Sequence, residues 1–267
     1  MSVQSSIEWT DATWNPVTGC TEVSPGCDHC YARTFAERWR GISGHPYEQG
    51  FDIRLWPERL ALPLQWKKPK RIFANSMSDL FHKDVPDHFI LQVFEIMAQA
   101  NWHTFQLLTK RPIRLAYLAP KITQRLAPFS AGSALWPSHI WLGVSVETMG
   151  YEWRVDQLRK VPAAVRFISA EPLLASLKSM NLDEIHWVIA GGESGPGYRY
   201  CNPNWVRELR DNCQQKGVSF FFKQWGGRTP TSGGRLLDGR TWDEYPVLPP
   251  LLDPILSGSE TVVEYVA

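Results

Sequence analysis

Short apolar runs recur along the chain and alternate with longer stretches that contain polar positions. The runs are nearly continuous in apolar residues, as expected of strands that are covered on both faces. Six strands are predicted at residues 71–76, 105–109, 140–146, 166–170, 187–192 and 219–225. We expect a seventh strand before them, near Thr13 to Val17.

The stretches between these runs have the apolar spacing and the boundary residues of helices. Apolar residues three and four positions apart follow Pro86, and Asn202, a good capping residue, precedes Pro203. The predicted helices span 28–39, 86–100, 112–118, 151–160 and 203–216. Repeated strand–helix alternation implies right-handed crossovers and a parallel sheet.

The strand count predicts an α/β fold built as a partial (β/α)6–7 TIM-like barrel of parallel strands. A doubly wound sheet is the alternative, because strand order cannot be read from one sequence. The C-terminal part differs, with Asp238-Gly239 as a two-residue hairpin signal before a proline-rich stretch. We therefore expect a barrel over residues 1–228 and an appendage over 229–267, a hairpin and tail packed on the barrel.

Composition narrows the class of protein without identifying a partner. The length of 267 residues suits one α/β barrel. With 28 basic against 27 acidic residues, bulk charge predicts neither a strong nucleic-acid binder nor a membrane-surface protein. The N-terminus lacks the pattern of a signal peptide, and no apolar stretch is long enough to span a bilayer. A cytoplasmic protein is expected, with cysteines that are reduced or bind metal.

Three of the five cysteines, Cys20, Cys27 and Cys30, lie close together in one loop. Three thiolates without a fourth suit a [4Fe–4S] cluster that leaves one iron open to a substrate or cofactor. The loop follows the first predicted strand, at the end where (β/α) barrels carry their active sites. The alternative is a zinc-stabilised binding module. The tight flanks of His29 argue against it as a fourth zinc ligand, whereas His45 or His82 could complete a site.

This loop resembles that of the radical SAM enzymes, although its first spacing is six residues instead of their usual three. His29 also stands where they usually have an aromatic residue. The segments TWNPVTGC, SPGCDHCYA, FANSMSDLF, LLTKRP, WLGVSVE, FISAEPLL, VIAGGESGPGYR and FFFKQWG resemble a bacterial and phage three-cysteine family of that superfamily. The resemblance covers roughly residues 6–245.

The resemblance implies that the open iron binds S-adenosylmethionine. One-electron reduction, by a flavodoxin- or ferredoxin-type protein, would then yield a 5′-deoxyadenosyl radical that abstracts hydrogen from a substrate. A nucleic acid or nucleotide is one expected substrate class, and a peptide or partner protein is another. A barrel that acts only through a partner protein, without catalysis, is a further alternative.

Residues at the strand ends are the remaining candidates for cofactor binding. The resemblance implies that the turn with Asn75, Ser76 and Asp79 meets the amino group of the cofactor, and that Ser145 and Glu147 bind its ribose hydroxyls. A turn that caps a helix is the alternative for residues 75–79. Glu171 is expected to face the cavity, as a ligand contact or as a solvated rim residue.

Candidates for substrate chemistry follow other strands. Lys110 and Arg111 bring two cations to the mouth, where they suit a carboxylate or phosphate. Glu193 and Arg199 lie in or near a glycine-rich turn and are predicted to contact substrate. Cys201 would donate a hydrogen atom to a product radical, as a cysteine does in the DNA photoproduct lyases of the superfamily. The catalytic candidates are therefore Lys110, Glu193 and Cys201.

Overall fold

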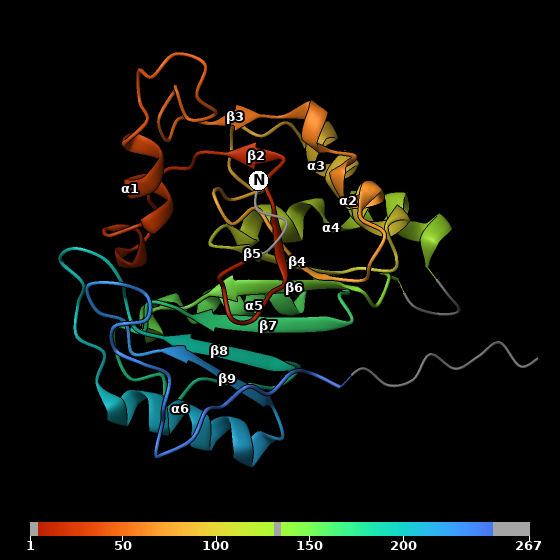
Figure 1. Ribbon diagram of the computed structural model, residues 1–267. Helices are drawn as coiled ribbons and strands as arrows, with labels where there is room; N and C mark the ends of the chain where they lie inside the picture. Colours follow the sequence, from red (N-terminus) through yellow and green to blue (C-terminus); the bar gives the residue numbers. More distant parts are fainter. Residues whose placement is uncertain (1–4, 131–134, 248–267) are drawn as a thin grey trace, which may run out of the picture.

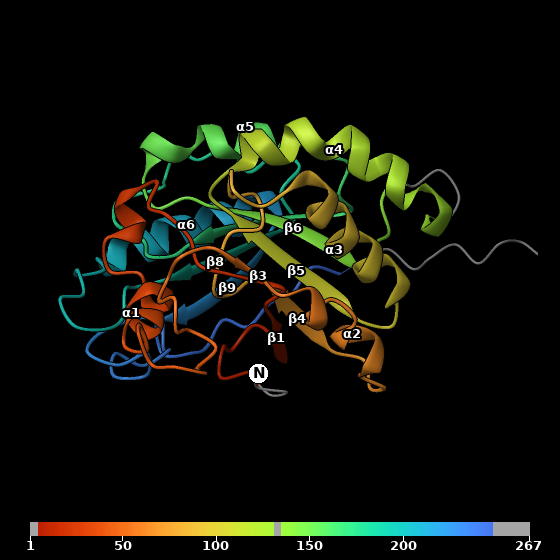
Figure 2. The same ribbon diagram turned by 90° about the horizontal axis from the view of Figure 1, so that it is seen from above.

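Seven parallel strands form the main sheet of the protein, whose computed structural model describes residues 5–130 and 135–247. In spatial order the strands are β1 (Ala12–Trp14), β4 (Arg71–Ala74), β5 (Thr104–Thr109), β6 (Ile140–Ser145), β7 (Val165–Ala170), β8 (Trp187–Gly191) and β9 (Ser219–Gln224). The sheet curls into a partial barrel (Figures 1 and 2), and this confirms the predicted fold class. A doubly wound sheet would reverse its strand order at a switch point, whereas the order here runs in one direction.

Helices cover the convex side of this sheet. They are α2 (Leu62–Gln65), α3 (Asp87–Gln99), α4 (Pro112–Leu126), α5 (Trp153–Arg159) and α6 (Pro203–Lys216). Helix α1 (Tyr31–Glu37) lies apart from them and packs against Phe51 in a separate small cluster. Figure 2 shows α3, α4 and α5 in a row outside the strands. Helix α6 has the predicted bounds, because the Asn202 side chain caps its start and Gly217 ends it with a φ of 66°.

Helix α4 extends beyond its predicted end at residue 118. Pro120 lies inside the helix, where it removes one backbone hydrogen bond. The apolar spacing nevertheless continues through Ile122 and Leu126, which are fully buried. Burial of these side chains offsets the loss of that backbone hydrogen bond, so tertiary packing decides the length of the helix.

Two hydrophobic cores lie on the two faces of the sheet. The larger one packs the helices against alternate strand residues such as Ile72 and Leu142. The second is rich in aromatic residues and contains Trp9, Trp141 and Phe167. Neighbours along one strand thus belong to different cores, which explains why the strands read as continuous apolar runs.

The predicted strand near Thr13 to Val17 is divided in the structure. β1 ends at Trp14, and β2 (Val17–Thr18) pairs antiparallel with β3 (Arg54–Leu55) in a separate two-stranded sheet. Pro16 lies between the two pieces and lacks the N–H that would continue the ladder. The break turns the chain away from the main sheet just before the cysteine loop, which we define as residues 20–30.

The segment after the last strand covers the free edge of β9. The N–H of Phe222 donates to the carbonyl of Trp242 at 2.8 Å, and Phe221 pairs antiparallel with Asp243. A tight turn precedes this pairing, with positive φ at Asp238 and Gly239. Pairing removes an exposed sheet edge. The remainder of the predicted tail, residues 248–267, lies outside the described residues.

Within residues 5–130 and 135–247, no helix has both the length and the apolar character needed to cross a lipid bilayer.

Candidate active site

The cysteine loop lies at the carboxyl end of the parallel strands, on the side of the molecule that carries α1 in Figure 1. Its thiols, those of Cys20, Cys27 and Cys30, are neither fully buried nor fully exposed. Burial is the largest cause that raises the pKa of Cys20, to about 11, and that of Cys30. The neighbouring Cys27 acts in the same direction on both. Cys27 is therefore close enough to interact electrostatically with each of the other two thiols.

Arg111 fixes one side of the loop. Its Nη1 donates to Cys20 Sγ at 3.2 Å and to Asp79 Oδ2 at 3.0 Å, and its Nη2 donates to the carbonyl oxygen of Thr21 at 2.8 Å. Asp79 also accepts from the Thr109 hydroxyl at 2.8 Å and the Lys110 N–H at 3.0 Å. The ends of β4 and β5 thus position one cation directly against a cysteine sulfur.

Glu147 fixes the middle of the loop from the end of β6. This fully buried carboxylate accepts from Ser24 Oγ at 2.8 Å, Lys110 Nζ at 2.5 Å and Arg154 Nη1 at 3.0 Å. Burial alone would raise the pKa of Glu147, but the charges of Lys110 and Arg154 outweigh it and hold this pKa below its usual value. A Cβ atom on Gly26 would lie 2.4 Å from Glu147 Oε1, so the loop approaches the carboxylate as closely as glycine allows.

Glu193 and Arg199 fix the far side of the loop. Glu193 accepts from His29 Nδ1 at 2.9 Å and from Arg199 Nη2 at 2.5 Å. Arg199 continues to the loop, where it donates to Asp28 Oδ2 at 3.1 Å and to the Pro25 carbonyl oxygen at 2.8 Å. Burial would raise the pKa of Glu193, but the hydrogen bonds from Arg199 and His29 hold it below its usual value. We call these three residues the Glu193 clamp: His29, Glu193 and Arg199.

The other predicted cofactor contacts lie at the same end of the sheet. Asn75 is buried with a φ of 63°, and its Nδ2 donates to Ser78 Oγ at 2.6 Å. Its Oδ1 is buried without a hydrogen-bond partner among the described residues. Ser76 Oγ pairs with Asn15, and Glu171 forms an ion pair with Lys223 at 3.1 Å. Ser145 is buried at the end of β6.

The donor chemistry of the loop fits a soft metal centre. No three His, Cys, Asp or Glu side chains of the described residues are already arranged around a metal position. Three thiols in one loop nevertheless match the preference of iron–sulfur clusters for thiolate ligands. The buried Oδ1 of Asn75 is an acceptor without a hydrogen-bond partner among the described residues, as an ammonium group of a ligand would require.

The histidines that would complete a zinc site have other partners. Besides His29 in the Glu193 clamp, His82 Nε2 lies 2.8 Å from Thr21 Oγ1. The ring of His45 stacks on Trp39 with centroids 4.1 Å apart, and its Nδ1 accepts from the Tyr47 N–H at 3.1 Å. Each imidazole therefore already has a hydrogen-bond or stacking partner other than a metal.

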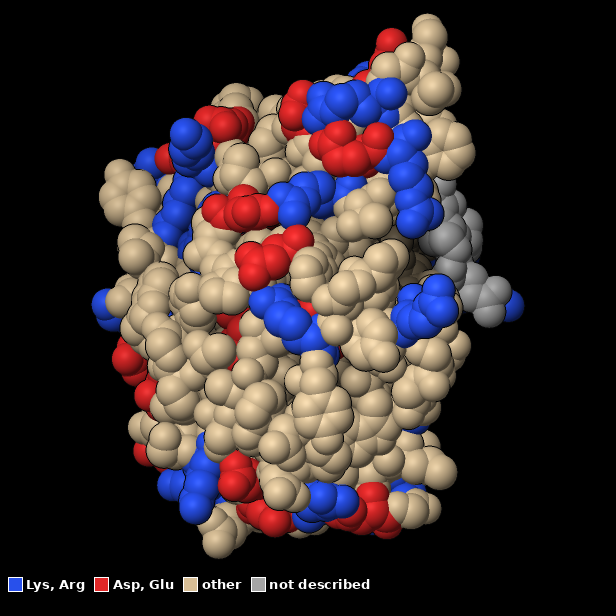
Figure 3. Space-filling view, turned by 90° about the vertical axis from the view of Figure 1, so that its left-hand side faces the viewer, with Lys and Arg blue, Asp and Glu red and all other residues tan. Residues whose placement is uncertain are grey.

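Charges of both signs are interspersed over the face that contains the strand ends, as Figure 3 shows. Most of the ion pairs described above join groups at the strand ends to one another, and Arg199 also pairs with Asp28 of the cysteine loop, so their charges are largely neutralised within the protein. Local charge here positions the loop and does not form a basic patch.

A pocket of about 540 Å³ lies next to the Glu193 clamp. Its lining includes Tyr198, Tyr200, Cys201, Trp225 and Arg228, as well as Arg199 of the clamp. Of these residues, the sequence analysis named Arg199 and Cys201 but missed both tyrosines and Arg228. Two tyrosines on either side of Arg199 in a glycine-rich loop were the available signal.

Fold and site together define a partial (β/α) barrel with a three-cysteine loop held over its carboxyl edge. Residues 4–246 match the family described as "Protein of unknown function (DUF5131)", and the chain belongs to that family. The comparison with curated proteins gave no match.

Three solved structures of spore photoproduct lyase are similar in backbone arrangement. A complex with dinucleoside spore photoproduct has a TM-score of 0.44 at 13% identity, over 74% of this chain and 59% of the lyase chain. A point mutant has a TM-score of 0.49 at 12% identity, over 77% and 74%. A double mutant with bound AdoMet and dinucleoside spore photoproduct has a TM-score of 0.44 at 14% identity, over 76% and 61%. The chain therefore spans less than two thirds of the first lyase structure.

Proposed function

We propose that this protein is a radical SAM-like enzyme that binds one [4Fe–4S] cluster through Cys20, Cys27 and Cys30. The observation that supports the proposal is that a loop with three cysteines lies at the carboxyl edge of a parallel partial barrel. This edge is where such barrels carry their active sites. The resemblance of the cysteine motif to that of radical SAM enzymes supports the same assignment.

The cofactors would supply the reactive chemistry, namely one-electron reductive cleavage of a carbon–sulfur bond of S-adenosylmethionine. The chain would bind and orient them. Asn75 Oδ1, buried and without a partner among the described residues, is our candidate acceptor for the amino group of S-adenosylmethionine. Arg111 donates to the sulfur of Cys20 and would tune the cluster through this hydrogen bond.

The two buried carboxylates take positioning roles in this proposal. Glu147 and Glu193 accept hydrogen bonds from side chains of the cysteine loop and from cations of the barrel. They would keep the loop closed over the strand ends. Lys110, which pairs with Glu147, would contribute to the same support.

Cys201 is our candidate donor of a hydrogen atom to a substrate radical. Burial raises the pKa of Cys201 to about 11, so the group carries its proton at neutral pH. Transfer would break the S–H bond, form a C–H bond on the substrate and leave a thiyl radical on Cys201. A small reductant protein of flavodoxin or ferredoxin type would supply electrons to the cluster, in a cytoplasmic setting.

Anaerobic reconstitution with iron and sulfide tests the proposal. We expect about four irons and four sulfides per chain, a brown protein, and 5′-deoxyadenosine after addition of dithionite and S-adenosylmethionine. Alanine at Cys20, Cys27 or Cys30 should abolish cluster binding. Cys213→Ala is the matched control, because Cys213 is fully buried in α6.

Two other results of this experiment would assign the protein to a different class. Colourless protein with one zinc per chain would overturn the proposal in favour of a zinc-stabilised binding module. An intact cluster that cleaves no S-adenosylmethionine under any reductant would favour a barrel that acts only through a partner protein.

A further inference from the structure

The pocket beside the Glu193 clamp is formed by two loops that pack tightly. One follows β8 and carries residues 192–203, and the other follows β9 and carries residues 225–233. A Cβ on Gly192 would lie 2.0 Å from the Trp225 carbonyl oxygen, and one on Gly226 would lie 2.1 Å from the Glu193 carbonyl oxygen. Backbone hydrogen bonds of 2.9 Å join Gly227 to Glu193 and Gly195. The walls of the pocket are therefore well fixed.

Aromatic side chains line this pocket without filling it. Tyr198 and Tyr200 are 45% and 73% exposed, so their rings remain available to a ligand. Trp225 is held in place, because its Nε1 donates to the Leu236 carbonyl oxygen at 2.9 Å and its ring packs edge-on against Phe222. Such rings offer flat surfaces for stacking a planar group.

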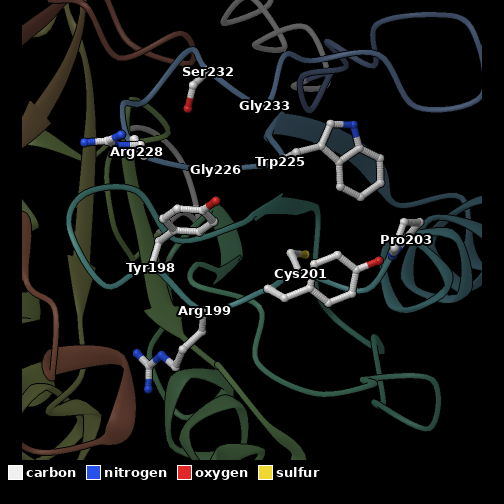
Figure 4. A pocket seen from close by; sticks show the side chains of 11 residues that line it. Tyr198, Arg199, Cys201, Pro203, Trp225, Gly226, Arg228, Ser232 and Gly233 are labelled. Carbon is white, nitrogen blue, oxygen red and sulfur yellow. The ribbon is translucent and has the colours of Figure 1, made fainter.

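The charge of the lining favours an anion. The lining contains no aspartate or glutamate among the described residues. Of its two arginines, Arg199 is neutralised by Glu193 and Asp28. Arg228 forms no ion pair with any described residue, so its charge is available. Figure 4 shows Arg199 and Arg228 on the same side of the pocket as Tyr198, with Trp225 and Pro203 on the other side.

We propose that this pocket binds a nucleotide, with its base against Tyr198, Tyr200 and Trp225 and its phosphate at Arg228. A nucleotide combines the planar ring and the anionic group that the lining complements, whereas the aromatic side chain of a peptide supplies only the ring. The volume of about 540 Å³ lies within the range of small-ligand sites. The assignment of this nucleotide as the substrate rests on the proposed function, but its binding does not.

The position of the pocket connects it to the cysteine loop. Arg199 lines the pocket and donates to Asp28 and to the Pro25 carbonyl oxygen of the loop. Cys201 lies at the pocket wall with only 4% of its surface exposed. A bound base would thus lie near the candidate hydrogen donor, and Arg199 would connect its site to the cysteine loop.

Calorimetric titration of the full chain, without iron or S-adenosylmethionine, tests this inference separately from the proposed function. The probes are uridine and guanosine 5′-monophosphates, which lack the adenine of S-adenosylmethionine, with the matching nucleosides. We expect Tyr198→Ala and Tyr200→Ala each to weaken nucleotide binding by roughly tenfold or more. Arg228→Ala should weaken nucleotide binding several-fold and leave nucleoside binding unchanged.

Control variants and further probes make the result decisive. Tyr117→Ala, which removes a 71% exposed tyrosine on α4, should bind as the wild type does. Tighter binding of a hexanucleotide than of either monophosphate would assign a single strand as the ligand, and equal binding would assign a free nucleotide. Unchanged affinity in the pocket variants would overturn the inference. So would equal binding of an acidic tyrosine-containing peptide.

Discussion

Replacement of Glu147 by alanine should destabilise the whole fold, because this carboxylate is the partner of two cations. It is fully buried and contacts Lys110 Nζ at 2.5 Å and Arg154 Nη1 at 3.0 Å. The two cations differ in what they can do after the substitution. The Lys110 side chain is 19% exposed and can turn to water, whereas that of Arg154 is 1% exposed and cannot.

The expected magnitude follows from the charge left on Arg154. Removal of one partner of a buried ion pair typically costs about 3–5 kcal/mol. Loss of this much stability should lower the Tm by about 10 °C for a chain of this size. Glu147→Gln keeps the shape that packs against Gly26 and one acceptor oxygen, so its effect should be smaller.

Urea denaturation followed by circular dichroism gives the required comparison. Asp156→Ala is the matched control, because Asp156 is 64% exposed and pairs with Arg159 on the surface of α5. The control should cost less than about 1 kcal/mol. A Glu147→Ala variant that unfolds at the same urea concentration as the control would refute the role of this buried pair.

The same carboxylate should make stability depend on pH in the acid range. The folded-state pKa of Glu147 is lowered: burial opposes ionisation, but Lys110 and Arg154 more than compensate. A lowered folded-state pKa stabilises the protein above the unfolded-state value of about 4.3, and the stabilisation is lost as the pH falls through the folded-state pKa. Wild type should therefore lose more stability than Glu147→Gln between about pH 5 and pH 3.

Three further predictions concern the support of the cysteine loop. Gly26→Ala should lower the free energy of unfolding, measured by urea denaturation, by about 1–3 kcal/mol, because its Cβ would collide with Glu147. Gly150→Ala is the control and should be tolerated, because the nearest atom to its Cβ would lie 3.5 Å away. Arg111→Gln should lower the midpoint potential of a reconstituted cluster in an EPR-monitored titration, because it weakens a cationic donor to Cys20, and an unchanged potential would exclude this tuning. Glu193→Gln should speed amide exchange in residues 192–200, and unchanged exchange would show that the Glu193 clamp does not hold this loop.

Strand positions were predictable because both faces of the sheet are buried, so that each strand is apolar along most of its length. Ile72 and Phe73 enter different cores, and such neighbours make β4 read as a continuous apolar run. The break after Trp14 was signalled by Pro16, but the antiparallel partner at Arg54 and Leu55 was not. A pair of two-residue strands has too short a pattern to be recognised in one sequence.

The sequence predicted the positions of the candidate site residues but not their partners. Parallel topology brings the strand ends together, so Asp79, Glu147 and Glu193 could be placed at one edge without a structure. Their partners could not, because long side chains select contacts from among all groups within reach. Arg154, from the first turn of α5, is one such partner of Glu147. Arg228 was missed for a different reason, because nothing in the sequence relates it to Tyr198 and Tyr200 across two loops.

The contacts that hold the cysteine loop should also affect how tightly this loop binds a metal. The cysteine loop is held near Cys20 by Arg111, at Ser24 by Glu147 and at Asp28 by Arg199, so that three separate strand ends determine its course. A loop that is ordered before it binds a ligand loses less conformational entropy on binding. Variants that loosen any one of these supports should therefore bind a metal centre more weakly even though all three cysteines remain. Weakening by Glu193→Gln, far from the sulfur of Cys20, would be the clearest sign that the order of the loop matters as much as its ligands.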